Sequence, residues 1–177
     1  MSWYRNRREF LLSASGAAVL LVSGCGFRPL YGSKSLGSVD SELARIKIGI
    51  ISERTGQQLH NYLLDRLNRK GRPEKPLYLL STKVNIETVR QAFEPDETAT
   101  RAKLVFTANF RLQDVATEEI LLTNWARSVN SYNIVTSAIS TRSAELDAID
   151  RSAREVSEEI RSLLALYFQR RAAEVEG

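Results

Sequence analysis

The clearest pattern in the chain is an alternation of apolar and other side chains between residues 102 and 113. The inward-facing candidates are Ala102, Leu104, Phe106, Ala108, Phe110 and Leu112. Between them stand Lys103, Val105, Thr107, Asn109, Arg111 and Gln113. Because successive side chains of a strand point to opposite faces, this pattern predicts a long strand with one buried and one exposed face. That arrangement is typical of antiparallel sheets.

Three further segments predict strands less cleanly. Isoleucines alternate along Ala44–Ile51, and apolar and polar side chains alternate along Leu77–Val89. In the second of these, Lys83 should share the exposed face with Asn85 and Glu87. Ile120–Tyr132 carries Trp125 and Val129 on one face, although two adjacent leucines blur its alternation.

Two segments have the spacing of amphipathic helices. In residues 55–70 a stripe is formed by Leu59, Leu63 and Leu67, with a glycine just past the end. Residues 144–171 repeat an apolar side chain every three or four positions, with charges on the opposite side. The second helix is expected to lie on a sheet, but its pattern would also suit a coiled coil.

The predicted order is therefore β-α-β-β-β-α. It indicates an α+β fold, with a four-stranded, mainly antiparallel sheet and two helices packed on one face. The expected organisation is a signal peptide over residues 1–24, a tether over 25–43, one domain over 44–171 and a tail over 172–177.

The first residues have the layout of an export signal. A basic stretch with Arg7 and Arg8 precedes an apolar run that is too short to span a membrane, and small residues lead to Cys25. This ending resembles the lipobox of bacterial lipoproteins, in which the cysteine is acylated and becomes the new N-terminus. An ordinary signal peptide with an incidental thiol is the alternative. The two arginines fit either twin-arginine or general secretory export.

Composition narrows the functional classes. Half of the net charge of +4 lies in the first 24 residues, and basic and acidic residues alternate elsewhere, which argues against a nucleic-acid binder. The chain has one cysteine and one histidine, His60, so a His/Cys metal cluster is excluded. No nucleophile–base set or nucleotide fingerprint is visible, and neither an enzymatic activity nor a cofactor is expected.

The run from Cys25 to Gly32, Cys-Gly-Phe-Arg-Pro-Leu-Tyr-Gly, resembles the mature N-terminus of the lipopolysaccharide-assembly lipoprotein family LptE in its alphaproteobacterial form. The opening of the first helix, Arg54–Leu59, and the order of elements are similar to the same family. The resemblance implies a lipid-anchored protein on the periplasmic side of the outer membrane. Such a protein plugs an LptD-type β-barrel, assists its assembly and helps insert lipopolysaccharide. Gly26, where inner-membrane lipoproteins often carry Asp, favours the outer membrane.

A plug should present a polar surface of mixed charge to a polar barrel interior. The candidate lipopolysaccharide-binding residues are Arg90, Arg101 and Lys103, which flank the loop between the second and third strands. They could equally be solvated charges, because Glu94, Asp96 and Glu97 lie in that loop.

Three other functions remain open from the residues alone. The chain could be a pilot lipoprotein for another outer-membrane assembly such as a secretin, an envelope hydrolase, or a structural lipoprotein that dimerises through its last helix.

Overall fold

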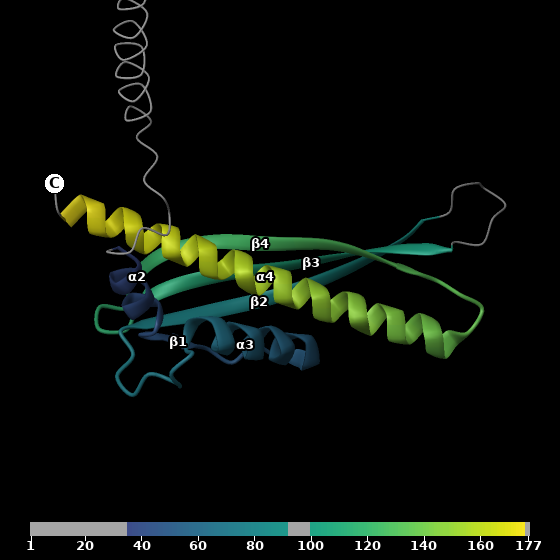
Figure 1. Cartoon of the computed structure of the whole chain (residues 1–177), viewed down its shortest axis with the longest axis horizontal. Helices are drawn as coiled ribbons and strands as arrows, with labels where there is room; N and C mark the ends of the chain where they lie inside the picture. Colours follow the sequence, from purple (N-terminus) through teal and green to yellow (C-terminus); the bar gives the residue numbers. More distant parts are fainter. Residues whose placement is uncertain (1–34, 92–99, 176–177) are drawn as a thin grey trace, which may run out of the picture. The chain divides into compact units, whose positions relative to one another are not determined.

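The computed structural model describes residues 35–91 and 100–175 of the chain. These residues form a four-stranded sheet in the order β1-β2-β3-β4 (Figure 1). The strands are β1 (Ile46–Ile48), β2 (Tyr78–Gln91), β3 (Arg101–Asp114) and β4 (Ile120–Asn133). β1 pairs parallel to β2, and the other two pairs are antiparallel. The predicted α+β fold with a mainly antiparallel sheet is confirmed.

The parallel pair follows from the connection between its strands. Helix α3 (Glu53–Leu67) lies between β1 and β2 in the chain, and a parallel pair requires such a crossover. β3 and β4 are joined differently, by a tight turn. In that turn the Asp114 carboxylate accepts backbone N–H groups of Ala116 and Thr117, and these bonds lower the pKa of Asp114.

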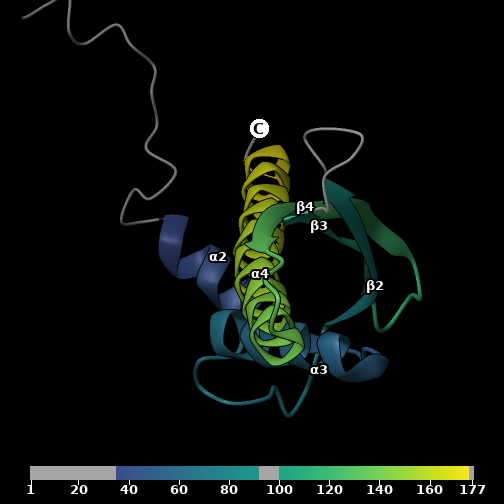
Figure 2. The ribbon, with the colours of Figure 1, turned by 90° about the vertical axis from the view of Figure 1, so that its right-hand side faces the viewer.

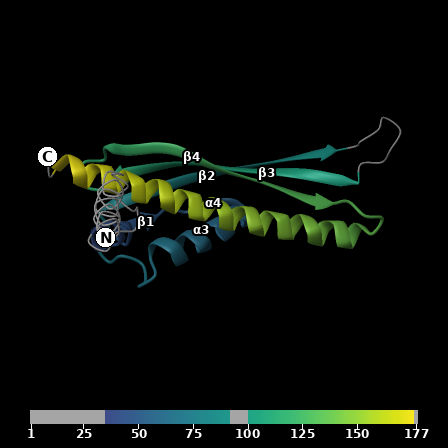
Figure 3. The same cartoon turned by 45° about the horizontal axis from the view of Figure 1, so that its top comes forward.

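The last helix, α4 (Ala138–Val175), runs across the sheet beside α3 (Figure 3). Figure 2 looks along α4 and shows β4 next to it and β2 farther away. α3 and α4 meet at Tyr62, whose hydroxyl donates to the Asp150 carboxylate at 2.6 Å. The guanidinium groups of Arg66 and Arg154 lie over the Tyr62 ring, so this contact combines a hydrogen bond with two cation–π contacts.

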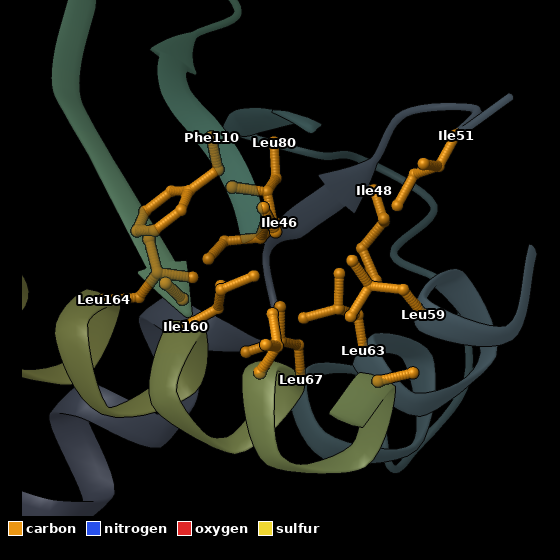
Figure 4. Close-up of a cluster of buried hydrophobic side chains, with 14 of the residues drawn as sticks. Ile46, Ile48, Ile51, Leu59, Leu63, Leu67, Leu80, Phe110, Ile160 and Leu164 are labelled. Atoms are coloured by element: carbon orange, nitrogen blue, oxygen red, sulfur yellow. The ribbon is translucent and has the colours of Figure 1, made fainter. Parts of the chain in front are cut away.

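The core lies between the helices and one face of the sheet (Figure 4). The leucine stripe of α3, the apolar stripe of α4 and the even-numbered side chains of β2 and β3 meet there. Its fully buried members include Leu59, Leu63, Leu80, Phe106, Phe110, Ile160 and Leu164. The α4 stripe that a coiled coil would use is thus buried within this domain.

Residues 35–43 differ from the sequence analysis, which assigned residues 25–43 to a tether. Ser35–Leu43 forms helix α2. Val39 and Leu43 are four residues apart, so they lie on one side of the helix, and both are buried. Asp40 of α2 also pairs with Arg161 of α4 at 3.4 Å. The helix therefore depends on contacts with the rest of the domain, which a Ser- and Gly-rich sequence does not reveal.

α4 begins at Ala138, six residues before its predicted start. Ser137 stands just before it, and its backbone oxygen accepts the N–H of Thr141 at 3.0 Å. The Ser137 hydroxyl accepts the N–H of Ser140 at 3.3 Å. Serine is a favoured residue at this position, so the Ser/Thr-rich stretch is the cap and first turns of the helix.

Candidate functional site

The two faces of the sheet differ in what covers them. The face formed by even-numbered residues packs on α3 and α4, whereas in the described part of the chain no helix or strand covers the other face. We call this second face the outer face. It consists of the odd-numbered side chains of β2 and β3 and those of β4 that pair with them in register. This uncovered face, built by three strands of 14 residues each, is the candidate site.

The outer face is strongly basic. Among the residues of β2, β3 and β4, its cations are Lys83, Arg101, Lys103, Arg111 and Arg127. Its carboxylate is Glu87, which accepts a hydrogen bond from Asn85 at 3.0 Å. Within the described residues, none of the five cations takes part in an ion pair. The mixed charge expected for this surface is therefore wrong for the outer face.

The strand geometry explains why the sequence analysis found no basic stripe. Charges alternate in sign along the chain, but a strand sends alternate residues to opposite faces, and the pairing register brings odd positions of three strands together. Arg127 joins Lys83 and Arg111 on one face although 44 and 16 residues separate it from them. Sorting each predicted strand by odd and even positions would have revealed this face.

The predicted binding residues do not form one cluster. Arg101 pairs with Gln91, and Lys103 pairs with Val89, so both lie on the outer face. Arg90 pairs with the fully buried Ala102 and lies on the helix-facing side.

Arg90 influences the pKa of Tyr132, which lies on the same side of the sheet. The pKa of Tyr132 is raised by burial and by the charge of Glu145, and the charges of Arg90 and Arg142 oppose this rise. Cys25, the predicted lipid attachment site, lies outside the described residues.

A groove of about 1140 Å³ occupies one end of the outer face. Its floor includes Ser81, Lys83, Asn109 and Arg111, and one wall is the segment from Gly49 to Glu53. Trp125 forms part of the opposite side and is 55% exposed, while Ile50 is 90% exposed. The groove thus combines two exposed apolar side chains with two cations on a polar floor. The sequence alone did not indicate that these four residues lie together.

Contacts with α3 hold the wall of this groove in place. The Gln57 side chain donates to the Ile51 carbonyl at 2.7 Å, and the His60 Nδ1 lies 3.2 Å from the Gly49 carbonyl oxygen. Gly56 packs so closely that a Cβ built on it would lie 2.6 Å from Ile51 Cγ2. His60 is half-buried, and it supports the wall.

The described residues contain no group of three or more His, Cys, Asp or Glu side chains that could hold a metal ion. In the same part of the chain, no helix is both long and apolar enough to cross a membrane. The outer face itself offers charged groups, hydrogen-bonding groups and exposed apolar side chains.

A family model and a bacterial protein of unassigned role match this chain. Residues 43–164 match the family model described as LptE, lipopolysaccharide-assembly. An uncharacterized protein of Rickettsia prowazekii is 26% identical over 151 residues, which is 85% of this chain and 93% of that protein.

Two solved structures share the fold. A candidate lipoprotein from Caulobacter crescentus superposes with a TM-score of 0.61 at 22% identity, covering 74% of this chain and 96% of that one. A lipoprotein B from Nitrosomonas europaea gives a TM-score of 0.54 at 14% identity, with 70% and 82% covered. The family match covers most of the described domain, from the end of α2 into α4. The chain therefore belongs to the LptE family of lipopolysaccharide-assembly proteins.

Proposed function

We propose that the chain is an outer-membrane lipoprotein that occupies the interior of an LptD-type β-barrel, assists assembly of that barrel and helps insert lipopolysaccharide into the outer leaflet. The observation that carries the proposal is the uncovered outer face, built by three strands of 14 residues each. The interior of an outer-membrane β-barrel is polar and lined by side chains, so a protein that fills it needs a rigid polar surface such as the outer face.

The way the sheet edge is closed supports a plug. A free edge strand invites pairing with other strands. Here α4 lies along β4, and the Glu159 carboxylate accepts the backbone N–H of Arg127 at 2.9 Å. Glu155 accepts the Ser128 hydroxyl at 2.5 Å in the same region. These contacts engage part of the β4 edge, and the side chains of the outer face are the surface that would meet a barrel.

Anchoring through Cys25 is part of the proposal. Each buried CH₂ of an acyl chain contributes about 0.8 kcal/mol, so one chain holds a protein only marginally and several make a durable anchor. An acylated cysteine ten residues before α2 would keep the domain at the periplasmic face of the membrane. The residues between Cys25 and α2 would then link the membrane anchor to the domain inside the barrel.

A lipopolysaccharide contact at Arg101 and Lys103 is also proposed. The two residues are neighbours on the same face of β3, and charged groups there can bind phosphate through charge-assisted hydrogen bonds. Arg90 would contribute less, because it lies on the opposite face of the sheet.

Recovery of the partner tests this function. The tagged full-length chain is extracted from outer membranes in mild detergent, and proteins that co-purify in stoichiometric amount are identified by mass spectrometry. We expect a single large β-barrel of the LptD type. A secretin in its place, or the chain alone, would overturn the assignment to this barrel.

A further inference from the structure

The charges of the domain are distributed unevenly between its two sides. On α4, four basic side chains pair with carboxylates, namely Arg142, Arg151, Arg154 and Arg161. On the outer face, the five cations named above face one carboxylate, and that carboxylate is engaged by Asn85. Within the described residues, the positive charge of this face is therefore left without ion-pair partners.

The basic charges are also close enough to repel one another. Lys83 pairs in register with Asn109, which is two residues from Arg111 on β3. Lys83 and Arg111 are therefore diagonal neighbours, a relation in which long side chains reach each other across about 7–8 Å. An acidic surface placed over this pair would relieve the repulsion.

The face also has apolar anchors of the kind used in protein interfaces. Trp125 is paired with Asn109 and lies next to Arg111 on the diagonal. Tryptophan and arginine are enriched among the side chains that carry most of the energy of protein–protein binding. Ile50 adds a second exposed apolar side chain on the far wall of the groove.

The spread of the cations favours a protein partner over a single glycolipid headgroup. Lys103 and Arg111 are eight residues apart on β3, which is about 26 Å at 3.3 Å per residue. A phosphate site would gather its donors around one point. Here the charges are spaced over the length of the strand, with the apolar Val105 and Val129 between them.

We propose that the groove end of the outer face is the surface that docks on the barrel, and that it binds an acidic, Asp- and Glu-rich strip of the inner barrel wall through Lys83 and Arg111, with Trp125 as the apolar anchor. This inference rests on the proposed function. It adds which face of the domain meets the barrel wall, and that the contacted part of the wall is acidic.

Charge reversal tests the docking surface in the full-length lipoprotein. The variant Lys83→Glu with Arg111→Glu is expressed in place of the wild type, and the ratio of barrel to lipoprotein is measured after extraction. We expect this ratio to fall at least about tenfold, because juxtaposed like charges cost several kcal/mol and 1.4 kcal/mol corresponds to tenfold. Trp125→Ala should lower the ratio without any change of charge.

A matched variant controls for net charge. Lys70→Glu with Arg170→Glu changes the charge by the same amount at two exposed cations outside the sheet. This variant should retain the wild-type ratio. Because all the substituted side chains are on the surface, both double variants should unfold at nearly the wild-type temperature, which a thermal melt of each purified protein checks.

The possible outcomes separate the two proposals. If the wild type recovers the barrel and the Lys83/Arg111 variant recovers it equally well, the docking surface is wrong and the proposed function stands. If that variant loses binding to purified lipopolysaccharide but keeps the barrel, the face binds glycolipid and the inference is overturned. If the wild type recovers no barrel, both proposals fail together.

Discussion

Tyr78, at the start of β2, ties the sheet to helix α2 through its hydroxyl. The hydroxyl donates to the Glu42 carboxylate at 2.8 Å, and the ring packs against Phe168 of α4. Burial raises the pKa of Tyr78 to about 12, and the hydrogen bond and charge of Glu42 add to the rise. One side chain thus connects α2, the sheet and α4.

This pKa predicts how stability changes with pH. The folded pKa of Tyr78 lies above the ordinary value of 10.0, so the neutral tyrosine stabilises the fold fully below pH 10. Its contribution is lost as pH rises from about 10 towards 12. We expect Tyr78→Phe to lower the free energy of unfolding by about 1 kcal/mol at pH 8, through the lost hydrogen bond.

Urea unfolding at pH 8, 10 and 11.5 measures this effect. Wild type should lose more stability than Tyr78→Phe between pH 10 and 11.5, by about 2 kcal/mol at most. Identical pH profiles for the two proteins would show that Tyr78 does not carry this dependence.

At the proposed lipopolysaccharide contact, Arg101→Ala with Lys103→Ala should weaken binding of purified lipopolysaccharide by about tenfold or more. The reason is the loss of charge-assisted hydrogen bonds, which contribute about 1.5–3 kcal/mol each. Arg90→Ala should have a smaller effect, and Lys70→Ala is the control. Unchanged binding in the double variant would show that Arg101 and Lys103 do not contact lipopolysaccharide.

At the scale of elements, Gly56 fixes the junction between β1 and α3. Glycine inside a helix costs about 1 kcal/mol relative to alanine, so Gly56→Ala would ordinarily stabilise the protein. Here the new Cβ would lie 2.6 Å from Ile51 Cγ2 and 3.1 Å from the Ile51 backbone, and Ile51 is buried. Because overpacking costs about 1–3 kcal/mol, we expect a net loss of about 1 kcal/mol and a lower Tm.

A second substitution shows whether the clash is the cause. Ile51→Ala removes the methyl group that the new Cβ would meet, so the penalty of Gly56→Ala should be smaller in the Ile51→Ala background. Thermal unfolding of the four proteins provides the comparison. A stabilising Gly56→Ala in the wild-type background would contradict the close packing.

How far the sequence predicts an element depends on where its stabilising contacts come from. β3 and the leucine stripe of α3 were predicted because each pattern is contained in its own segment. α2 was missed because its Val39 and Leu43 matter only through packing on the rest of the domain. The parallel pairing of β1 depends on the α3 crossover between β1 and β2, and no pattern within β1 itself indicates it.

The candidate site was likewise predictable from the sequence only in part. The sequence identified the exposed faces of β2 and β3 and placed Trp125 and Val129 on one side of β4, which is confirmed. It grouped Arg90 with Arg101, although the alternation along β2 already places Arg90 on the side of the buried Leu80. The groove wall at Ile50 could not be foreseen either, since it depends on how α3 returns beneath the sheet.

For the whole molecule, the central claim is that the described domain is enclosed by its partner. A plug differs from a peripheral subunit in that a barrel wall surrounds it on several sides. Asn109 is exposed on the outer face, and Ser162 is exposed on α4, which packs on the other side of the sheet. These two positions can therefore report separately on what lies against each side.

The most direct measurement is photo-crosslinking in living cells, with a photoreactive amino acid replacing Asn109 in one strain and Ser162 in another. The account predicts that both positions crosslink to the same large outer-membrane β-barrel, identified by mass spectrometry. Crosslinks to that barrel from only one of the two positions, or to different proteins, would contradict the enclosed position that defines a plug.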